Sequence, residues 1–283
     1  MQQHTLAQEI EIKGIGLHSG CESVLTLKPA PEDFGIVFKR VDLPEQVEIQ
    51  ALYHNVVDTR NCTCLGDDKG NIVSTIEHLM AALSMLGVDN VLIEINNQEM
   101  PIMDGSALPF ITALEYAGIK EQKSPRKILK VLKKVEYTDD KGNRIELLPA
   151  NDFGIEFMIE FPSQIVGRQK FNKPLTLSNF KTFVAPCRTF CEKYQVDYLK
   201  SIGLIKGGSL ENAVVLDGET ILNEGGFRVE NECVNHKVID AIGDMYTSGF
   251  HIAGHLNAAK TGHFHNNEIL KILFADTANY EII

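Results

Sequence analysis

A histidine and two aspartates recur one helical turn apart in the segment that begins at Asn235. On a helix that turns about 100° per residue, His236, Asp240 and Asp244 lie in one sector roughly 80° wide, opposite an apolar face. A histidine and an aspartate one turn apart can bind a single divalent metal ion. A solvated polar face with an i,i+4 His–Asp pair would show the same pattern. This helix by itself therefore leaves a metal site and a solvated face open.

A second candidate for chemistry is the dipeptide Glu77-His78, at or near the start of another predicted helix. Neighbouring side chains on a helix point about 100° apart, so the histidine can bind a metal while the carboxylate faces a bound water. In a zinc helix of the H-E-x-x-H type the general base directly follows the first ligand, but here Lys237 follows His236. The base must then come from elsewhere, and Glu77 is the candidate. Taken alone, the dipeptide also fits an ordinary surface pair.

Histidines are concentrated near the C-terminal end of the chain. Four of the nine fall between positions 251 and 265, at His251, His255, His263 and His265. His263 follows a glycine at the end of a predicted strand and precedes a predicted helix, a position from which side chains reach into clefts. His251 and His255 lie within the strand, and we interpret them as structural.

Composition and charge restrict the class of protein. With 283 residues, 44% of them hydrophobic and 23% charged, the chain suffices for one large or two ordinary globular domains. The formal net charge of −11 argues against non-specific nucleic-acid binding, and an anionic substrate would need a local basic pocket. No apolar run reaches the roughly 18 residues of a membrane span. The first residues lack the features of a signal peptide, so we expect a cytoplasmic protein.

The six cysteines form no C-x-x-C pair. Without an export signal, reduced thiols are favoured over a disulfide framework. Cys62 with Cys64, or Cys187 with Cys191, could supply half of a metal site, although small buried thiols are the commoner use of such residues.

The same order of elements occurs twice along the chain. In each half, strand signals precede a helix, a strand and a second helix, which predicts a duplicated α+β unit. The charged stretch 120–127 contains a proline and no apolar period, so it is interpreted as a linker between domains 1–122 and 128–283. A cleft between two such units could bring His78 and His236 together. The predicted helix, strand and helix are 75–86, 91–95 and 106–118 in the first half, and 230–247, 250–259 and 266–274 in the second.

Six blocks of sequence, in order along almost the whole chain, match the motifs of one known family. They are Gly14–Gly20, Ser74–Leu83, Pro101–Phe110, Arg188–Phe190, His236–Asp244 and Lys260–Asn267. In these blocks the chain resembles the zinc-dependent UDP-3-O-acyl-N-acetylglucosamine deacetylases of bacterial lipid A (lipopolysaccharide) biosynthesis. The resemblance implies an α+β fold in which two similar sheet-and-helix domains pack face to face around the active site, each carrying a small insert.

The resemblance also implies a zinc ion bound by His78, His236 and Asp240, with one position open for water. Glu77 would be the general base when this water attacks the N-acetyl amide of the substrate. The products would be the free amine and acetate, at an early committed step of lipid A biosynthesis. Zinc suits amide hydrolysis because it polarises the carbonyl and brings the pKa of a bound water to about 7.

Three more residues receive catalytic roles from the same resemblance. His263 would stabilise the oxyanion or protonate the leaving amine, and Thr189 would hydrogen-bond the tetrahedral intermediate. Asp244 would hold His263 in its orientation and charge state. The two aspartates of one helix would thus have separate tasks, since Asp240 binds the metal and Asp244 acts on a histidine.

Members of this family carry two inserts that shape the substrate site, corresponding here to about 58–74 and about 190–214. In the second, Tyr194, Tyr198 and Ile202 are spaced four residues apart, which by itself is typical of a stripe facing a core. The resemblance instead assigns these three residues to one wall of a tunnel for the acyl chain of the substrate.

A UDP group would need cationic and aromatic contacts. Lys237 follows a predicted zinc ligand and has no acidic residue four positions away, so we expect its ammonium group to be free for a phosphate. Lys260 lies near His263 in the sequence. Phe190, at the start of the second insert, and Phe161, at the end of a predicted strand, are the aromatic candidates for substrate binding.

Two other functions stay open at the level of sequence. A zinc amidase or peptidase could use the same ligands on another substrate, and a duplicated α+β protein could be a binding module without activity. The acyl-tunnel insert and the paired lysines favour the nucleotide sugar. We therefore expect a cytoplasmic monomer that acts on a UDP-linked acylated sugar, binds no nucleic acid, has no transmembrane segment and touches a membrane at most peripherally. Zinc or ferrous iron would suit the predicted ligands.

Overall fold

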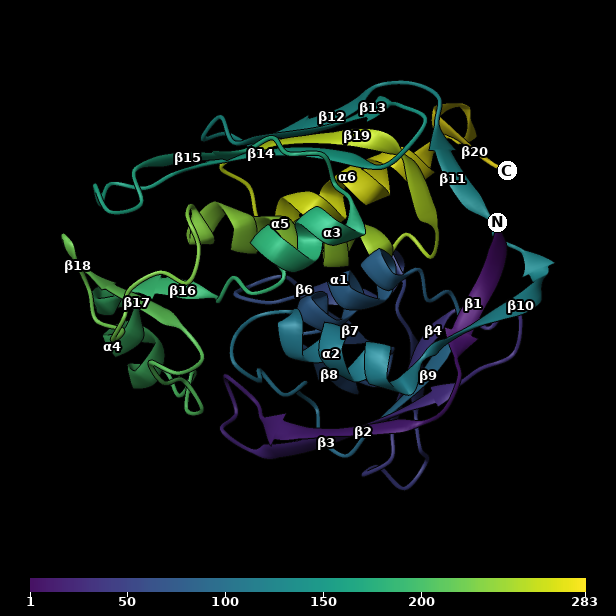
Figure 1. Ribbon diagram of the computed structural model, residues 1–283, viewed down its shortest axis with the longest axis horizontal. Helices are drawn as coiled ribbons and strands as arrows, with labels where there is room; N and C mark the ends of the chain where they lie inside the picture. The colour runs from purple at the N-terminus through teal and green to yellow at the C-terminus, as the bar shows by residue number, and fades with distance from the viewer.

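Two β-sheets enclose two layers of helices in the computed structural model, which describes residues 1–283 (Figure 1). One sheet belongs to each half of the chain, and each half packs helices against its own sheet. This arrangement confirms the predicted α+β class. The helices are α1 (Glu77–Leu86), α2 (Leu108–Ala117), α3 (Leu177–Asn179), α4 (Lys193–Ser201), α5 (Glu232–Tyr246) and α6 (His263–Ala275), with short η1 (Tyr53–Asn55), η2 (Phe180–Val184) and η3 (Thr277–Asn279).

The N-terminal sheet has five strands in the order β2-β3-β9-β4-β5. Strands β4 and β9 run parallel, and the other neighbours run antiparallel. In β9 the apolar residues Val91, Ile93 and Ile95 are buried and alternate with half-buried ones, as a strand with one face on a core requires. The strands are β2 (Ile10–Ile15), β3 (Glu22–Pro29), β4 (Ile36–Arg40), β5 (Glu48–Gln50) and β9 (Val91–Ile95).

The C-terminal sheet has seven strands and is organised around β19. This strand pairs with β11 at its beginning and with β13 and β14 farther along. It ends at Ala259, and after three residues the chain enters α6 at His263. The sequence predicts that this helix begins at 266, but it begins three residues earlier. Its first residue is therefore His263, the histidine expected to take part in catalysis. The strands are β11 (Ile128–Val131), β12 (Val135–Thr138), β13 (Arg144–Pro149), β14 (Gly154–Glu160), β15 (Arg168–Phe171), β19 (His251–Ala259) and β20 (Tyr280–Ile282).

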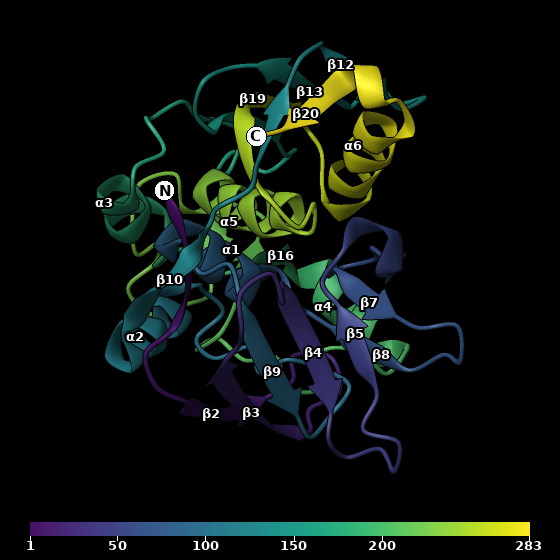
Figure 2. The same cartoon turned by 90° about the vertical axis from the view of Figure 1, so that its right-hand side faces the viewer.

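Helices α1 and α5 pack against each other in the middle of the molecule and join the two halves (Figures 1 and 2). Gly243 makes this contact possible, because a Cβ atom there would lie 2.0 Å from the carbonyl oxygen of Glu77. Helix α1 ends at Gly87, whose left-handed φ of 71° is the usual way to stop a helix. Both helices lie within two residues of their predicted bounds.

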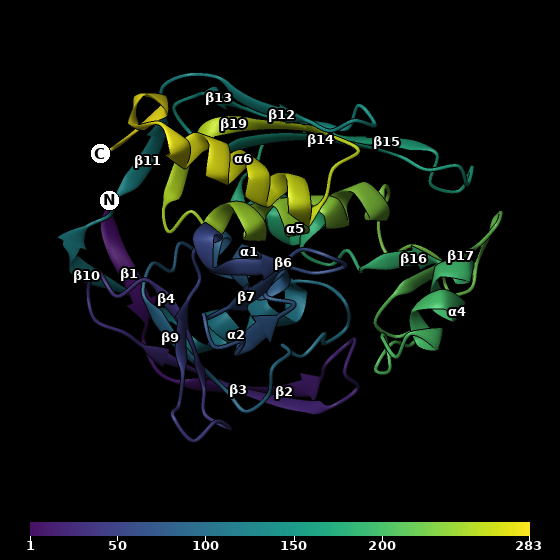
Figure 3. The ribbon, with the colours of Figure 1, turned by 180° about the vertical axis from the view of Figure 1, so that it is seen from behind.

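Each of the two inserts is a small three-stranded sheet separate from the two main sheets (Figure 1). The first contains the predicted hairpin and one further strand. The second contains α4 between two parallel strands, and it projects from the rest of the molecule (Figure 3). The strands are β6 (Val56–Asp58), β7 (Cys64–Gly66) and β8 (Ile72–Ser74) in the first insert, and β16 (Phe190–Glu192), β17 (Val214–Asp217) and β18 (Thr220–Ile221) in the second.

The stretch interpreted as a linker between the two domains is mostly a strand. Strand β10 (Ile119–Pro125) pairs antiparallel with β1 (Gln2–Leu6) near the start of the chain. The sequence gives no strand signal here because this strand is polar and largely exposed, so backbone pairing with a distant segment, rather than an apolar period, gives it its structure. None of the helices has both the length and the hydropathy needed to cross a bilayer.

Candidate metal centre and active site

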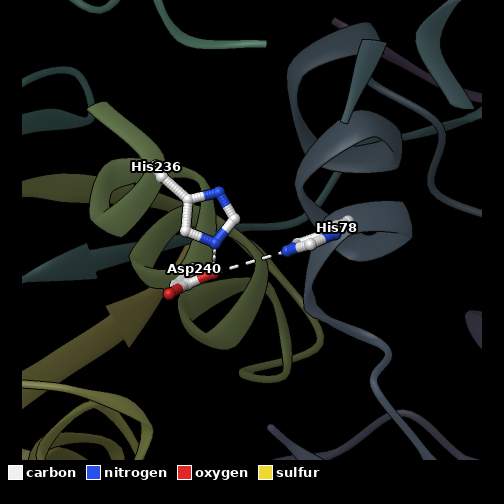
Figure 4. Close-up of side chains that lie close together, drawn as sticks. All are labelled: His78, His236 and Asp240. Carbon is white, nitrogen blue, oxygen red and sulfur yellow. Dashed lines mark ion pairs between the residues drawn. The ribbon is translucent and has the colours of Figure 1, made fainter. Parts of the chain in front are cut away.

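Three potential metal ligands from two helices meet where α1 contacts α5. His78 lies at the start of α1, and His236 and Asp240 lie one turn apart on α5. Asp240 Oδ1 lies 3.7 Å from His78 Nε2 and 3.4 Å from His236 Nε2 (Figure 4). One ligand atom from each residue falls within 4.8 Å of the other two, and all three residues are buried. This group could hold one divalent metal ion.

The protonation states of His236 and Asp240 fit a metal ion. Burial lowers the pKa of His236 to about 3, so its imidazole is neutral. Its Nδ1 lies 3.0 Å from the carbonyl oxygen of Cys187, which places the ring hydrogen there and leaves Nε2 with a lone pair. Burial alone would raise the pKa of Asp240, but the neighbouring Lys237 ammonium holds it well below its ordinary value. A neutral imidazole and an ionised carboxylate are what metal binding requires.

The polar face of α5 is not solvated. His236 and Asp240 are each 2% exposed and Asp244 is 3% exposed, because α1 and the first insert cover this side of the helix. The interpretation of the pattern as a solvated face is therefore wrong. Both sides of α5 are buried, so the polar groups on this side need partners within the protein.

Glu77 lies next to the first of these ligands and is 3% exposed. Its Oε2 accepts a hydrogen bond of 3.1 Å from the backbone N–H of Thr63 in the first insert. Burial raises the pKa of Glu77 above its ordinary value, although His263 and His78 oppose this shift. A carboxylate with a raised pKa is better able to accept a proton during a reaction near neutral pH.

His263 is held by a buried carboxylate. Its Nδ1 lies 2.7 Å from Asp244 Oδ2, which also accepts from Asn266 Nδ2 at 2.8 Å. Thr63 Oγ1 donates to Asp244 Oδ1 at 2.6 Å and lies 3.2 Å from the histidine ring. Burial opposes a charged imidazole here, but Asp244 outweighs it and raises the pKa of His263 to about 9. The histidine is thus an imidazolium at neutral pH.

Sequence reasoning missed Thr63 and Asn266 as members of this network. Thr63 lies between the two cysteines that were considered as half of a metal site. Those thiols are free and buried, and burial raises the pKa of Cys64 to about 12, which disfavours a thiolate ligand. No cysteine belongs to the cluster of potential ligands. The only sequence signal for Thr63 is its place in a buried hairpin, whereas Asn266 is one turn past His263.

A cavity of about 760 Å³ opens beside His263, between the second insert and the body of the molecule. Its polar side includes Lys237, Lys260 and Thr189. The rings of Phe161 and Phe190 also line it and meet edge to face, with centroids 5.4 Å apart. Its apolar side comes mainly from the second insert, through Val196, Leu199, Ile205, Leu210, Ala213, Val215 and Leu222.

A family model described as UDP-3-O-acyl N-acetylglycosamine deacetylase matches residues 3–275 of the chain. The chain belongs to this family. A UDP-3-O-acyl-N-acetylglucosamine deacetylase of Haemophilus ducreyi is 44% identical over 287 residues, which cover 100% of this chain and 93% of the relative. The enzyme of the same name from Myxococcus xanthus is 44% identical, covering 99% and 89%, and that from Aliarcobacter butzleri is 40% identical, covering 100% and 93%.

Membership of this deacetylase family makes the protein an amidohydrolase. The cluster, Glu77 and His263 lie within the matched region, as do both inserts. Six of the residues expected to act on a substrate line this one cavity, although they are spread over about 100 positions of the sequence. They are Phe161, Thr189, Phe190, Lys237, Lys260 and His263.

The stripe on α4 does not face the cavity. Tyr194, Tyr198 and Ile202 are 71%, 63% and 53% exposed and are absent from the cavity wall. Val196 and Leu199 line it instead, from the opposite side of the same helix. This helix has apolar residues on two sides, and spacing alone does not determine which of the two sides faces the cavity.

Lys237 is not a free cation. Its Nζ donates to Asp240 Oδ2 at 2.7 Å. Asp240 lies three positions along the helix, whereas the sequence prediction considered only the residues four positions away, which are not acidic. The side chain still lines the cavity and is 25% exposed, with Nζ 5.9 Å from the Phe190 ring centroid. Lys260 Nζ lies 3.6 Å from Glu160 Oε2 and is more exposed.

Proposed function

We propose that this deacetylase hydrolyses the N-acetyl group of a UDP-3-O-acyl-N-acetylglucosamine, giving acetate and the free amine at an early committed step of lipid A biosynthesis. The observation that carries the proposal is the buried His78, His236 and Asp240 cluster, with Glu77 and His263 beside it, next to a cavity with a polar and an apolar side. The names of full-length relatives support the substrate.

In this proposal His78, His236 and Asp240 bind a zinc ion. When bound, zinc would polarise the amide carbonyl and lower the pKa of water. Two imidazoles and one carboxylate are ligands that zinc favours, and their burial supports a tightly held ion. The hydrogen bond between His236 Nδ1 and the Cys187 carbonyl would fix the ring that binds it.

Glu77 takes the proton of the water that attacks the acetamide carbonyl carbon. Its raised pKa supports this role, because a more basic carboxylate accepts the proton of the water more readily near neutral pH. The Thr63 N–H would keep one carboxylate oxygen in place while the proton is carried.

His263 acts as the cation of the site. Held by Asp244, its imidazolium stabilises negative charge on the amide oxygen or protonates the leaving amine. The Thr189 hydroxyl would donate to the same oxygen from the cavity wall. Bond cleavage then leaves the acetyl carbon as acetate and the sugar nitrogen as an amine.

In this proposal the two ends of the substrate contact different parts of the cavity lining. Lys237 and Lys260 would contact the diphosphate, and the rings of Phe161 and Phe190, which also line the cavity, would contact the nucleoside or sugar. The apolar wall of the second insert would accept the acyl chain through Val196, Leu199, Ile205, Leu210 and Val215.

The experiment that tests the proposal measures acetate release by the purified protein from three acetamides. These are UDP-3-O-acyl-N-acetylglucosamine, UDP-N-acetylglucosamine without the acyl chain, and an acetylated peptide. We expect turnover of the first to exceed the others, to stop when a chelator removes the metal and to return with zinc. Equal turnover of all three, or activity that survives complete removal of the metal, would contradict the proposal.

A further inference from the structure

A carboxylate far from the metal ligands in sequence is buried without a charged partner. Glu99 is 2% exposed, and its two oxygens each accept one backbone hydrogen bond of 2.7 Å, from the N–H groups of His18 and Ser19. Two consecutive N–H groups on one carboxylate form a small anion site built from backbone. The proposed reaction uses neither this carboxylate nor the Gly14–Gly20 motif.

The loop of residues 16–20 is shaped to close on this carboxylate. A Cβ atom at Gly16 would lie 2.4 Å from Glu99 Oε2. Gly20, at the other end of the loop, has a left-handed φ of 68°, which favours glycine. The glycines of the motif therefore allow a close approach of backbone to carboxylate.

On its other side the same loop holds the second insert. The N–H of Lys206 donates to the His18 carbonyl at 3.2 Å, and the N–H of Gly207 donates to the Leu17 carbonyl at 3.0 Å. A Cβ atom at Gly207 would lie 2.3 Å from the carbonyl oxygen of Gly16. The segment 205–208 that follows α4 is thus fixed to the body of the protein through this loop.

Both partners of this contact form part of the cavity wall. Leu17 and His18 from the loop line the cavity, and so do Ile205 and Gly208 from the insert. A displacement of the loop would move the apolar lining of the cavity, whereas the contact between α1 and α5, which carry the metal ligands, does not include the loop. Glu99 also accepts a hydrogen bond of 3.5 Å from Thr75 Oγ1, two residues before α1, so metal content is measured as a control.

We propose that Glu99 is a positioning residue for acyl-chain recognition. Its carboxylate fixes the loop 16–20, and the loop fixes the end of the second insert against the cavity. The inference rests on the proposed function, because it takes that wall to be the one that meets the acyl chain.

Glu99→Gln tests the chain of contacts with little change in size. A glutamine offers one carbonyl oxygen and turns its NH₂ group toward the second backbone N–H, so one charge-assisted bond is weakened and the other is replaced by two opposed donors. Glu99→Asp keeps the charge on a shorter side chain and serves as the conservative variant. Glu94→Gln, on β9 and paired with Lys28 at the surface, is the matched control.

Hydrogen exchange gives the first readout, and it needs neither substrate nor metal. In Glu99→Gln we expect faster exchange at four amides: His18 and Ser19, which bond to Glu99, and Lys206 and Gly207, which bond to the loop. Glu94→Gln should leave all four unchanged. Loss of protection confined to His18 and Ser19 would mean that the effect ends in the loop, and the proposal would be wrong.

Kinetics with substrates of long and short acyl chains give the second readout. In Glu99→Gln we expect KM for the long-chain substrate to rise about tenfold, with kcat changed less than about twofold, and a smaller rise for the short-chain substrate. Metal content should equal that of the wild type, and Glu99→Asp should restore part of the loss. An equal change for both chain lengths would overturn the positioning role.

The two proposals fail in different ways. If the wild type does not deacetylate the nucleotide sugar at all, the proposed function fails while the exchange experiment still tests the connection from Glu99 to the insert. If Glu99→Gln does not fold, the exchange and kinetic comparisons apply to Glu99→Asp, and wild-type behaviour of that variant in both would contradict the proposal.

Discussion

At the scale of single residues, the environment gives similar side chains different tasks. Glu77 and Asp244 are both buried carboxylates within one site. Burial raises the pKa of Glu77, whereas Asp244 accepts hydrogen bonds from Thr63 and Asn266 and lies against the His263 ring. The first is suited to gain and lose a proton, and the second to remain an anion that keeps His263 charged.

Replacing Glu77 tests the assignment of the base. Glu77→Gln keeps the size and removes the basicity, so we expect kcat to fall by roughly 10²–10⁴ while one metal ion per chain is retained. His78→Ala should lose the metal as well as the activity. Metal analysis and steady-state kinetics on both variants check this, and near-normal turnover of Glu77→Gln would place the base elsewhere.

Replacing Lys237 tests the nature of the substrate. Its side chain lines the cavity and its Nζ bonds to Asp240. Lys237→Ala should therefore lower kcat/KM for the UDP sugar by an amount that corresponds to about 1.5–3 kcal/mol of transition-state stabilisation, as expected for a lost charge-assisted hydrogen bond to phosphate. Lys271→Ala on the exposed side of α6 is the control. The loss should shrink with a substrate that lacks phosphates. An equal loss on both substrates would show that the lysine acts through Asp240 alone.

At the scale of elements, the approach of α1 to α5 sets the geometry of the site. His78 comes from one helix and His236 with Asp240 from the other, so the distance between the helix axes decides whether the three can share an ion. Gly243 on α5 faces the first turn of α1 at the level of Glu77. The absence of a side chain at Gly243 therefore determines the position of both Glu77, the proposed base, and His78, the first proposed ligand.

Adding a methyl group at this contact should weaken the metal site. A Cβ atom at Gly243 would meet the Glu77 carbonyl at 2.0 Å, so Gly243→Ala must push α1 away. We expect a loss of stability of about 1–3 kcal/mol, the usual cost of overpacking, together with weaker metal binding. Urea denaturation and metal titration measure the two effects. Wild-type metal affinity in a stable Gly243→Ala protein would show that the separation of the helices is not critical.

At the scale of the whole molecule, a second polar cluster joins the halves at the far end of the same helices. Asp89, just after α1, accepts from Arg126 Nε at 2.8 Å and Nη2 at 2.7 Å, and from the backbone N–H of His4 at 2.6 Å. His251, the first residue of β19, lies 3.4 Å from the same carboxylate. Tyr246, the last residue of α5, donates to the Val88 carbonyl at 2.7 Å. These contacts fix one half against the other.

Breaking this cluster should destabilise the whole protein. Arg126 and Asp89 are 9% and 14% exposed, so Arg126→Ala leaves a mostly buried carboxylate without its cation and should cost about 3 kcal/mol. The adjacent Lys127 pairs with Asp33 at the surface and offers a matched control, since Lys127→Ala should leave stability nearly unchanged. Urea denaturation compares the two. Equal stability of the two variants would contradict a structural role for the cluster.

The same cluster should make stability depend on pH. Burial lowers the pKa of His251 below its ordinary value of about 6.5, although Asp89 opposes the shift and the nearby Arg126 and His4 add to it. Below that pH the unfolded chain binds the proton more readily than the folded one, so stability falls as the pH decreases from about 6.5. The pKa of Asp89 is lowered too, despite its burial, and its contribution is lost only in more acid solution, below about pH 4.

Unfolding free energies at pH 8 and pH 5.5 check this prediction. His251→Asn removes the titrating group, so the loss of stability between the two pH values should be smaller than in the wild type. His54→Asn, at an exposed position, should behave like the wild type. An unchanged pH dependence in His251→Asn would rule out this histidine as the source.

Much of the fold and part of the site follow from the sequence, because local patterns decide them. The apolar period from residue 75 and the glycine at Gly87 give α1, and the run of β-branched residues gives β9. The order of strands and helices gives the α+β class. Spacing alone also placed His236, Asp240 and Asp244 on one side of a helix. In each case neighbours along the chain carry the information.

The tertiary structure decided what depends on partners far away in sequence. Only the contact between α1 and α5 brings His78 to Asp240, and only the fold of the first insert brings Thr63 to Asp244. A polar segment became β10 because β1 offered it hydrogen bonds, and α4 turned Val196 rather than Tyr194 to the cavity. Periodicity shows that a helix has sides, but burial against a distant segment determines which side is inside, because the free energy of burial belongs to the pair of surfaces and not to either sequence alone.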